Sequence, residues 1–278
     1  SVPTTWEALR TAAQRLRVPN DSEQRIQQAG VAMGTIANVE HFSDILGLLL
    51  LQNGADPTKP DECSSTNNPK LGRPDCWGQD AFLFYDIFRA EGLWDDTLPT
   101  STYAFATEQV AMMFAPSWRA FEIAEINPDL AFMTAPVPQL TDNKIAWATY
   151  WVEGVSRDSE HSDMAWKFLA YLSQDETLQK LYTAQSNVRL FGEIYPKVDL
   201  ARELINDDII GAFVEQGEYA QSWYMSSYTH DNGINDQIIK YYEDGMNDIA
   251  DGENPERVLP TVTSGVDQVF SRYGLSNN

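Results

Sequence analysis

The stretch from Phe105 to Trp118, FATEQVAMMFAPSW, places the strongest constraint on how this chain can fold. It contains a short apolar run, Val110 to Phe114, between polar residues and an Ala-Pro-Ser turn. Such a run between turn signals predicts a buried strand, although periodicity alone leaves a helix open. Pro116 cannot continue a central strand, and Ser117 can cap a helix that starts at Trp118. Ligands bind where the strands of open α/β sheets end, so Trp118 is predicted to stand at a cleft.

The chain is strongly acidic, with a net charge of −22 at pH 7 over 278 residues. Nucleic acids and anionic membrane surfaces are polyanions, so this charge argues against both as partners. The longest apolar block, Ile45 to Leu51, is far shorter than the roughly 18 residues that a membrane-spanning helix needs. The chain starts at Ser1 without an initiator methionine or a signal peptide, which we interpret as a processed or trimmed start. Its length predicts one large domain or two smaller ones.

Two cysteines, Cys63 and Cys76, lie in a segment rich in Asn, Pro, Ser and Gly, with 12 residues between them. Two thiolates alone cannot close a structural zinc site, and the three histidines are scattered along the chain. A disulfide that holds this loop is favoured and fits an oxidising, extracytoplasmic compartment. A pair of free thiols is the alternative that two cysteines leave open. Residues 56–77 are predicted to form a long surface insertion.

Catalytic motifs are missing from the sequence. It contains no nucleophile elbow, P-loop, dinucleotide-binding glycine motif, HExxH zinc motif or DxDxDG calcium loop. Neighbouring carboxylates such as Asp95 and Asp96 are expected by chance in a chain with 41 acidic residues. A glycosidase needs two carboxylates held roughly 5–10 Å apart across a sugar cleft, which the sequence alone cannot test. We therefore predict no catalytic residue, no metal and no cofactor, and keep a carbohydrate-active enzyme as an alternative.

Several segments together resemble the extracellular solute-binding proteins of ABC importers, in the sugar-binding branch that includes maltose-binding protein. The strand–turn–tryptophan pattern reads Val110-Ala111-Met112, then Ala115-Pro116, then Trp118. The other matching segments are PTTWEALRTAAQRL at residues 3–16, Gln52-Asn53-Gly54-Ala55, and Ala165 to Leu172 followed by Glu176. The motifs are individually loose but occur in the family's order over nearly the whole chain. One departure is Arg257-Val258, where the family prefers Ala-Leu.

The resemblance implies an α/β, periplasmic-binding-protein-like fold of type II. Residues 1–138 and 206–278 would form an essentially complete second (C-terminal-type) lobe, and 139–205 a partial first (N-terminal-type) lobe. Hinge crossings are expected near 135–145 and 200–207. In the family a segment the size of a small domain precedes the PTTWEALRTAAQRL helix. This implies that the chain lacks the N-terminal part of the first lobe, being either a fragment or a chain that another polypeptide completes.

The resemblance also implies a ligand site in which Trp118 stacks on a sugar. The loop before a helix expected from Val39 to Asn53 faces the cleft in the family, although ordinary capping by Asn38 explains this segment equally well. One of the two aromatics at 150 and 151, in a strand expected over 145–155, is assigned to the ligand and the other to the core. The polar and aromatic segment 221–235 suits a carbohydrate site or a plain surface loop. The predicted ligand-binding residues are Trp118, Arg119, Asn38, Glu40, His41, Tyr150, Trp151, Trp223, Tyr228 and Asn235.

By the same resemblance, Trp166 and Phe168 are predicted to pack in the core of the first lobe. The implied function is the capture of a sugar or oligosaccharide by a monomer outside the cytoplasm, for delivery to an ABC permease. Closure of the hinge would bury the ligand. Lipid anchoring through a segment before Ser1 is left open. A carbohydrate-active enzyme and a non-transport interaction module on the same fold are the alternatives.

Overall fold

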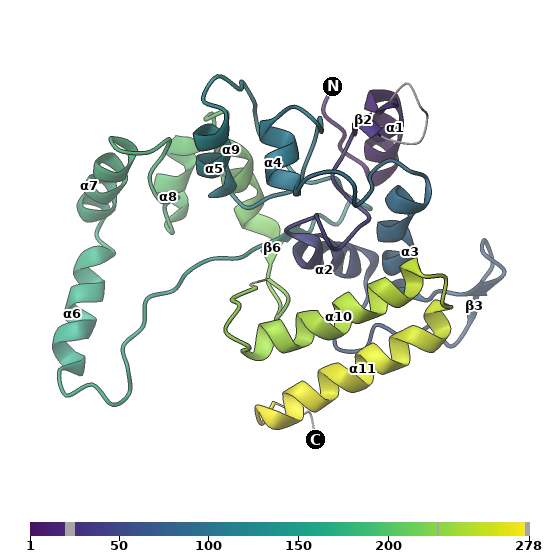
Figure 1. Cartoon of the computed structure of the whole chain (residues 1–278). Helices are drawn as coiled ribbons and strands as arrows, with labels where there is room; N and C mark the ends of the chain where they lie inside the picture. The colour runs from purple at the N-terminus through teal and green to yellow at the C-terminus, as the bar shows by residue number, and fades with distance from the viewer. Residues whose placement is uncertain (20–25, 227, 276–278) are drawn as a thin grey trace. The chain divides into compact units, whose positions relative to one another are not determined.

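The computed structural model describes residues 1–19, 26–226 and 228–275, and Figure 1 shows their elements in chain order. The chain divides into two compact units, each of which is described by itself. Unit 1 comprises Ser1–Ala115, Val137–Ala148 and Tyr219–Asn278, and unit 2 comprises Pro116–Pro136 and Thr149–Glu218. The lobe boundaries and hinge crossings that the family resemblance implies stay a prediction.

Helices make up most of the regular structure in both units. Unit 1 contains α1 (Trp6–Leu16), α2 (Phe42–Asn53), α3 (Trp77–Ala90), α4 (Ser101–Ala106), α10 (Ile234–Ala250) and α11 (Pro255–Arg272). Its strands are the short pairs β1 (Val18–Pro19) with β2 (Ile26–Gln28), β3 (Asn67–Asn68) with β4 (Arg73–Pro74), and β5 (Ala146–Trp147) with β6 (Ala220–Gln221). Unit 2 contains α5 (Arg119–Ile126), α6 (Ser162–Leu172), α7 (Asp175–Ser186), α8 (Val198–Ala201), the 3-10 helix η1 (Arg202–Leu204) and α9 (Gly211–Gln216). The 3-10 helix η2 (Gly217–Tyr219) joins the two units in sequence.

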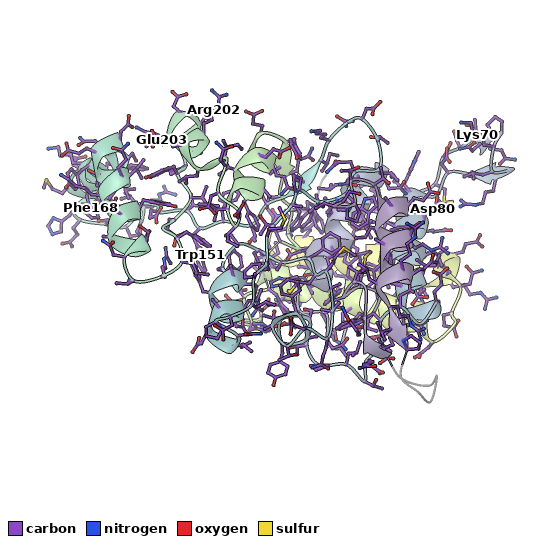
Figure 2. The ribbon with its side chains drawn as sticks, turned by 90° about the horizontal axis from the view of Figure 1, so that it is seen from above. Lys70, Asp80, Trp151, Phe168, Arg202 and Glu203 are labelled. Carbon is purple, nitrogen blue, oxygen red and sulfur yellow. A yellow bond between two sulfur atoms is a disulfide. The ribbon has the colours of Figure 1, made fainter. Side chains whose placement is uncertain are left out.

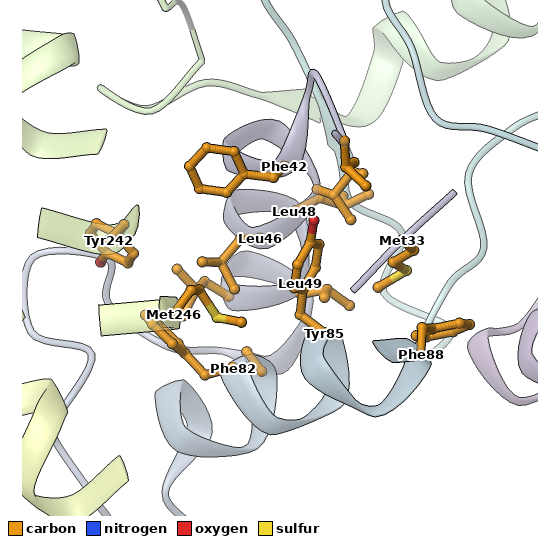
Figure 3. Packing of buried hydrophobic residues seen from close by; sticks show 14 of the residues in the cluster. Met33, Phe42, Leu46, Leu48, Leu49, Phe82, Tyr85, Phe88, Tyr242 and Met246 are labelled. Atoms are coloured by element: carbon orange, nitrogen blue, oxygen red, sulfur yellow. The ribbon is translucent and has the colours of Figure 1, made fainter. Parts of the chain in front are cut away.

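The core of unit 1 lies where α2, α3 and α10 meet, as Figure 3 shows. Helix α2 carries the run Ile45–Leu51 and is buried along most of its length. An apolar helix of this kind belongs in an interior, where it contacts neighbours on several sides. Leu46 of α2, Phe82 of α3 and Met246 of α10 are all essentially inaccessible to solvent. These three helices therefore form one continuous apolar core.

Two glycines let α10 and α11 approach closely, and Figure 1 shows the two helices side by side. An added Cβ at Gly245 would lie 2.7 Å from Val262, and one at Gly265 would lie 2.2 Å from the Tyr241 ring. Pro260 lies inside α11, and the helix continues through it to Arg272. Proline removes one backbone hydrogen bond, and the burial of α11 residues against α10 outweighs that loss.

Residues 29–32 and 110–113 lie side by side, in parallel. Ala29 donates its backbone N–H to Gln109 (2.8 Å), and Ala32 donates to Met112 (3.0 Å). The pairing consists of isolated bridges, Ala29 with Val110 and Ala32 with Met113, rather than a continuous ladder. The buried strand expected over residues 110–114 is therefore only partly formed, because Val110 alone is buried and the pairing is limited to isolated bridges. The turn before Trp118 follows this paired segment directly in sequence.

Cys63 and Cys76 form a disulfide, with their Cα atoms 4.1 Å apart. The bond closes the insertion between α2 and α3, which otherwise holds only the two-residue strands β3 and β4. The favoured interpretation of the two cysteines is therefore confirmed. Because Cys76 immediately precedes Trp77, the first residue of α3, the disulfide ties the loop to a core helix.

Removing this disulfide should destabilise unit 1. We expect the double variant Cys63→Ser, Cys76→Ser to lose about 3 kcal/mol of unfolding free energy, because the unfolded chain regains the entropy of an open loop. Urea unfolding followed by circular dichroism measures this loss. The wild-type chain in reducing agent serves as the control and should match the variant. Equal stability of the oxidised and reduced wild-type chains would contradict the prediction.

Unit 2 has a much smaller core, built on Ala120, Phe191 and Ile210. The Phe121 and Phe191 rings lie 4.5 Å apart, and Thr134 ties its segment to Asp208 by a backbone hydrogen bond of 3.0 Å. Residues 130–134 form no strand. Their backbone is held instead by contacts to the turn at 208–209.

Helix α6 corrects a second expectation. Trp166 and Phe168 were predicted to pack in a core, but they are 60% and 59% exposed, and Figure 2 labels Phe168 on this helix. No described residue of α6 is buried. Burial requires an opposing apolar surface, and none of the described residues provides one for these two side chains.

Candidate functional site

The turn at residues 116–118 presents the side chain on which the predicted site depends. Arg119 donates its backbone N–H to Pro116 (3.2 Å), and Ala120 donates to Ser117 (3.1 Å). Helix α5 begins at Arg119 with Trp118 in the N-cap position, one residue later than the sequence predicts. The indole of Trp118 is 41% exposed. A flat apolar ring therefore stands at the surface beside the start of a helix that the buried Ala120 anchors.

Arg119 lies directly after this tryptophan, and its charge has a partner on the same helix. Its guanidinium donates to the Glu122 carboxylate one turn later, in an i,i+3 ion pair. Pairs of this spacing are common on helix surfaces and hold the side chain along the helix. Arg119 is therefore oriented along α5, and most of its side chain is covered.

Asn38 is buried and occupied within unit 1. Its amide donates to the backbone carbonyls of Asp95 (2.9 Å) and Leu98 (3.0 Å), and its carbonyl oxygen accepts from the Trp94 indole (2.9 Å). It does not cap α2, which begins at Phe42 with His41 in the N-cap position, so that expectation is wrong. A buried amide prefers full hydrogen bonding, and the nearby loop supplies it. A ligand contact by Asn38 stays a prediction, and it would require these bonds to be exchanged.

Glu40 binds the start of the neighbouring helix α4. Its carboxylate accepts the Thr102 backbone N–H (2.9 Å), and its own N–H donates to the Ser101 hydroxyl (3.2 Å). The first turn of a helix has free N–H groups and a partial positive charge, so it attracts a carboxylate. Glu40 therefore fixes the junction between the loop before α2 and α4.

Hydrogen bonds link His41 to Asp44 and Asp44 to the indole of Trp147. Its Nδ1 lies 2.9 Å from Asp44, and the other oxygen of Asp44 accepts from the Trp147 indole (2.8 Å). Gly47 lies directly under the Trp147 ring, where a Cβ would come within 2.4 Å of it. Sequence reasoning did not single out Asp44 or Trp147. The i,i+3 spacing of His41 and Asp44 was the only available signal, and it is common on ordinary helices.

The segment 221–235 divides between core and surface. Trp223 packs its ring against Tyr242 and Phe270 at centroid distances of 6.4 and 6.2 Å, so it serves the unit 1 core. Tyr228 is exposed, and its ring lies 4.1 Å from that of His230. Asn235 is half-buried as the second residue of α10. Of the three predicted residues, Tyr228 alone presents a largely accessible aromatic face.

A buried carboxylate shapes the turn that carries Tyr228. Asp236 accepts the backbone N–H groups of Thr229 (2.9 Å) and Asn232 (2.8 Å). His230 and Asn232 both have left-handed backbone, with φ of 57° and 58°. Such conformations persist in non-glycine residues only where the surroundings fix them. His230 is thus held beside Tyr228, although the sequence analysis did not include it among the site residues.

Tyr150 and Trp151 are both on the surface of unit 2. Trp151 is 90% exposed, and Figure 2 labels it on the extended segment before α6. The strand expected over 145–155 is wrong beyond its start, because only Ala146–Trp147 forms β5, paired in parallel with β6. The expectation that one of the two aromatics packs in a core is also wrong for the described residues. Trp118, Arg119, Tyr150 and Trp151 belong to unit 2, and the other six predicted residues belong to unit 1.

The described residues form a hollow beside α7, and they contain no cluster suited to a metal ion. A hollow in unit 2 is lined by residues of α7 and its C-cap, namely Glu176, Gln179, Lys180, Thr183, Ala184 and Asn187. It contains none of the predicted site residues and is a groove along one helix. Within residues 1–19, 26–226 and 228–275, no group of three or more His, Cys, Asp or Glu side chains is placed to hold a metal ion.

Comparison with known proteins identifies the family. The family of bacterial extracellular solute-binding proteins matches residues 1–201, which is most of the chain. The chain belongs to this family. None of the curated proteins compared with the chain by sequence matches it.

Solved structures of solute-binding proteins share the fold. An ABC-transporter solute-binding protein from Thermotoga lettingae, bound with α-D-tagatose, matches 97% of the chain with a TM-score of 0.61 and 18% identity. The sugar-binding protein MalE from Xanthomonas citri matches 99% with a TM-score of 0.64 and 16% identity. A MalE maltose/maltodextrin-binding domain from Bdellovibrio bacteriovorus, bound to maltotriose, matches 98% with a TM-score of 0.58 and 13% identity.

These likenesses confirm the expected fold class, α/β and of the type II periplasmic-binding-protein kind. The chain spans 65%, 65% and 67% of the lengths of these three proteins. It therefore corresponds to about two thirds of a solute-binding protein of this kind. In the part of the chain that the structure describes, none of the helices has the length and apolar character needed to cross a bilayer.

Proposed function

We propose that this solute-binding protein captures a sugar or oligosaccharide outside the cytoplasm and delivers it to an ABC permease. The observation that carries the proposal is the exposed indole of Trp118 at the start of α5, in a chain that belongs to the extracellular solute-binding family. The structural neighbours bound to tagatose and maltotriose support the choice of sugar.

The chemistry of the side chains favours a neutral, hydroxyl-rich ligand. The C–H face of a pyranose stacks on a flat aromatic ring, and an indole offers the largest such ring with an N–H donor at its edge. Anionic ligands are usually held by Arg or Lys, yet the chain has 19 basic residues against 41 acidic ones. Arg119, the basic residue nearest the tryptophan in sequence, is paired with Glu122. We infer that the ligand carries no net negative charge.

The other proposed contacts fall into two chemical groups. Tyr150, Trp151 and Tyr228 offer exposed rings that can add stacking surface. Glu40, His41 and Asn235 offer carboxylate, imidazole and amide groups that can bind hydroxyls. Sugar sites combine stacking rings with a few polar groups, and the proposed residues include both kinds of group.

The proposed role is binding and release rather than catalysis. The family comprises binding proteins of the extracellular face, which supports both this role and an extracytoplasmic location. The disulfide at Cys63–Cys76 is consistent with an oxidising compartment. We propose that the protein works as a monomer and needs no cofactor.

Replacing Trp118 with alanine tests the site directly. We expect the dissociation constant for the preferred sugar to rise about 30- to 100-fold, the loss typical of a buried aromatic anchor. Isothermal titration calorimetry on the protein as its source produces it, with maltotriose, tagatose and a wider sugar panel, measures this change. Tyr103→Ala is the matched control, because Tyr103 is a similarly exposed aromatic that lies outside the proposed site.

The possible results test the stacking role of Trp118 separately from sugar capture by the protein. Unchanged affinity of the Trp118→Ala protein would show that the indole is not the stacking surface. Absence of heat or thermal shift with every sugar of the panel, for the wild-type protein, would overturn sugar capture itself. Conversion of a sugar to products would instead favour the carbohydrate-active enzyme.

A further inference from the structure

The chain contains two Asn-Gly pairs, Asn53-Gly54 and Asn232-Gly233. Asparagine is a thermolabile residue, because the backbone nitrogen of the following residue can attack its side-chain amide. Glycine in that next position has no Cβ, so it leaves the nitrogen uncovered and gives the backbone the freedom that the attack needs. The two pairs share the same intrinsic chemistry, and their surroundings therefore decide which of them reacts.

Asn53 is held at the end of helix α2. It is the last residue of the helix, and its side-chain amide donates to the backbone carbonyl of Trp77 at 2.7 Å. The backbone N–H of Gly54, the C-cap, donates to Leu51 at 3.1 Å. Both groups that would have to react are thus hydrogen-bonded at the end of a helix that is buried along most of its length. Asn53 can react only when this helix end opens.

Asn232 lies in the turn before α10 and is exposed. Its printed bonds all run through the backbone, since its N–H donates to Asp236 (2.8 Å) and its carbonyl accepts from Gln237 (2.7 Å). Its side-chain amide has no hydrogen-bond partner among the described residues. The N–H of Gly233 donates to Asp231 (2.8 Å), whose carboxylate is itself exposed, so water can take its place. The amide of Asn232 is therefore able to turn toward the Gly233 nitrogen.

We propose that Asn232 is a site of spontaneous chemical modification, where asparagine is converted to aspartate and isoaspartate while Asn53 stays intact. Hydroxide takes the proton of the Gly233 N–H, and the nitrogen forms a bond to the side-chain carbonyl carbon of Asn232. The amide nitrogen takes a proton from water and leaves as ammonia, which closes a cyclic imide. Water then opens the imide at either carbonyl. One opening gives aspartate, and the other gives isoaspartate, whose main chain contains an extra carbon atom.

The conversion should loosen the turn that presents Tyr228. It adds a carboxylate to a turn that already holds those of Asp231 and Asp236, and like charges in one turn repel. The longer main chain of isoaspartate also displaces the N–H that Asn232 donates to the buried Asp236. The Tyr228 and His230 rings, 4.1 Å apart, depend on this turn for their placement. The consequence concerns the turn alone and does not depend on which ligand the protein binds.

Peptide mapping by mass spectrometry tests the proposal on the natural protein, kept folded in mildly alkaline buffer. We expect the peptide with Asn232 to convert at least about tenfold faster than the peptide with Asn53, because the helix end must first open. An isoaspartyl methyltransferase assay detects the isoaspartate. In urea, where both pairs are unfolded, the two peptides should convert at similar rates. Equal rates in the folded protein, an intact Asn232, or a difference that persists in urea would each overturn the proposal.

Two variants test the chemistry and its effect on the turn. Gly233 has a φ of −70°, which alanine also adopts, and an added Cβ would lie nearest the flexible carboxylate of Asp231. Gly233→Ala should therefore leave the melting temperature unchanged and slow the conversion several-fold, because the Cβ shields the nitrogen. An unchanged rate would show that the reaction does not pass through this nitrogen, contrary to the proposal.

Asn232→Asp supplies the added charge without the extra main-chain carbon. Hydrogen exchange of amides 229–236 should be slowest in the fresh wild-type protein, faster in Asn232→Asp, and fastest in wild-type protein that has been aged until Asn232 is converted. Aged protein that exchanges as slowly as fresh protein would overturn the expected loosening of the turn.

Discussion

Replacement of Phe82 by alanine is expected to lower the free energy of unfolding of unit 1 by about 4 kcal/mol. Phe82 lies on α3 and is fully buried, as Figure 3 shows. Its ring stacks on Tyr242 of α10 at a centroid distance of 5.7 Å and reaches the backbone near Gly245. Removing the ring leaves a cavity where two helices meet. The surroundings of the ring are closely packed, so the neighbouring helices can relax only partly into that cavity.

Leu83→Ala provides the control for this prediction. Leu83 is the next residue of the same helix and is 47% exposed, so its truncation removes helix-surface packing without opening a cavity. We expect that change to stay within about 0.5 kcal/mol. Urea unfolding followed by circular dichroism compares both variants with the wild-type chain. A loss below about 1 kcal/mol for Phe82→Ala would mean that the ring does not fill the interior as described.

Replacement of Gln52 by leucine should have a comparably large effect, about 4 kcal/mol, because it leaves three buried polar groups without partners. Gln52 is buried near the end of α2. Its carbonyl oxygen accepts from the Trp6 indole (2.7 Å), and its amide donates to the carbonyls of Pro138 (3.0 Å) and Ile145 (2.8 Å). The Gln52 side chain therefore links α2 both to α1 and to residues 138–145. Leucine matches the size of glutamine but supplies none of these bonds.

Gln27→Leu is the matched control, since Gln27 is an exposed residue of β2. It should leave stability within about 0.5 kcal/mol of wild type. Hydrogen exchange adds a readout specific to the network, because the amides of α1 should lose protection in Gln52→Leu and keep it in the control. If α1 stays fully protected in the Gln52 variant, the three hydrogen bonds do not hold that helix in place.

Sequence reasoning predicted the elements whose pattern is local. The helix expected from Val39 to Asn53 forms as α2 from Phe42 to Asn53, and the helix expected at Trp118 forms as α5 from Arg119. The disulfide was favoured from loop composition, and the family was indicated by motif order. The strand expected over 145–155 fared worse, because a strand exists only through its partner, and only Ala146–Trp147 pairs with another strand.

The candidate site shows the same division. Trp118 was expected at a cleft from the Ala-Pro-Ser turn; its ring is 41% exposed beside the start of α5, and the cleft stays a prediction. The polar residue Asn38 was also chosen for its type and position, but a distant loop at 94–98 occupies its amide. No pattern in the sequence indicates that a loop some 60 residues away will hydrogen-bond to the side chain of Asn38. His230 was missed because its placement depends on the buried Asp236.

The sequence by itself determined the acidic character, indicated the family and favoured the disulfide, because these depend on composition, motif order and local residue types. Only the tertiary structure decided which polar side chains are used internally and which apolar ones lack a partner. Gln52, Asn38 and Phe168 illustrate this, since their roles follow from what lies opposite them. Local propensity selects an element, whereas burial and hydrogen bonding are set by contacts between residues far apart along the chain.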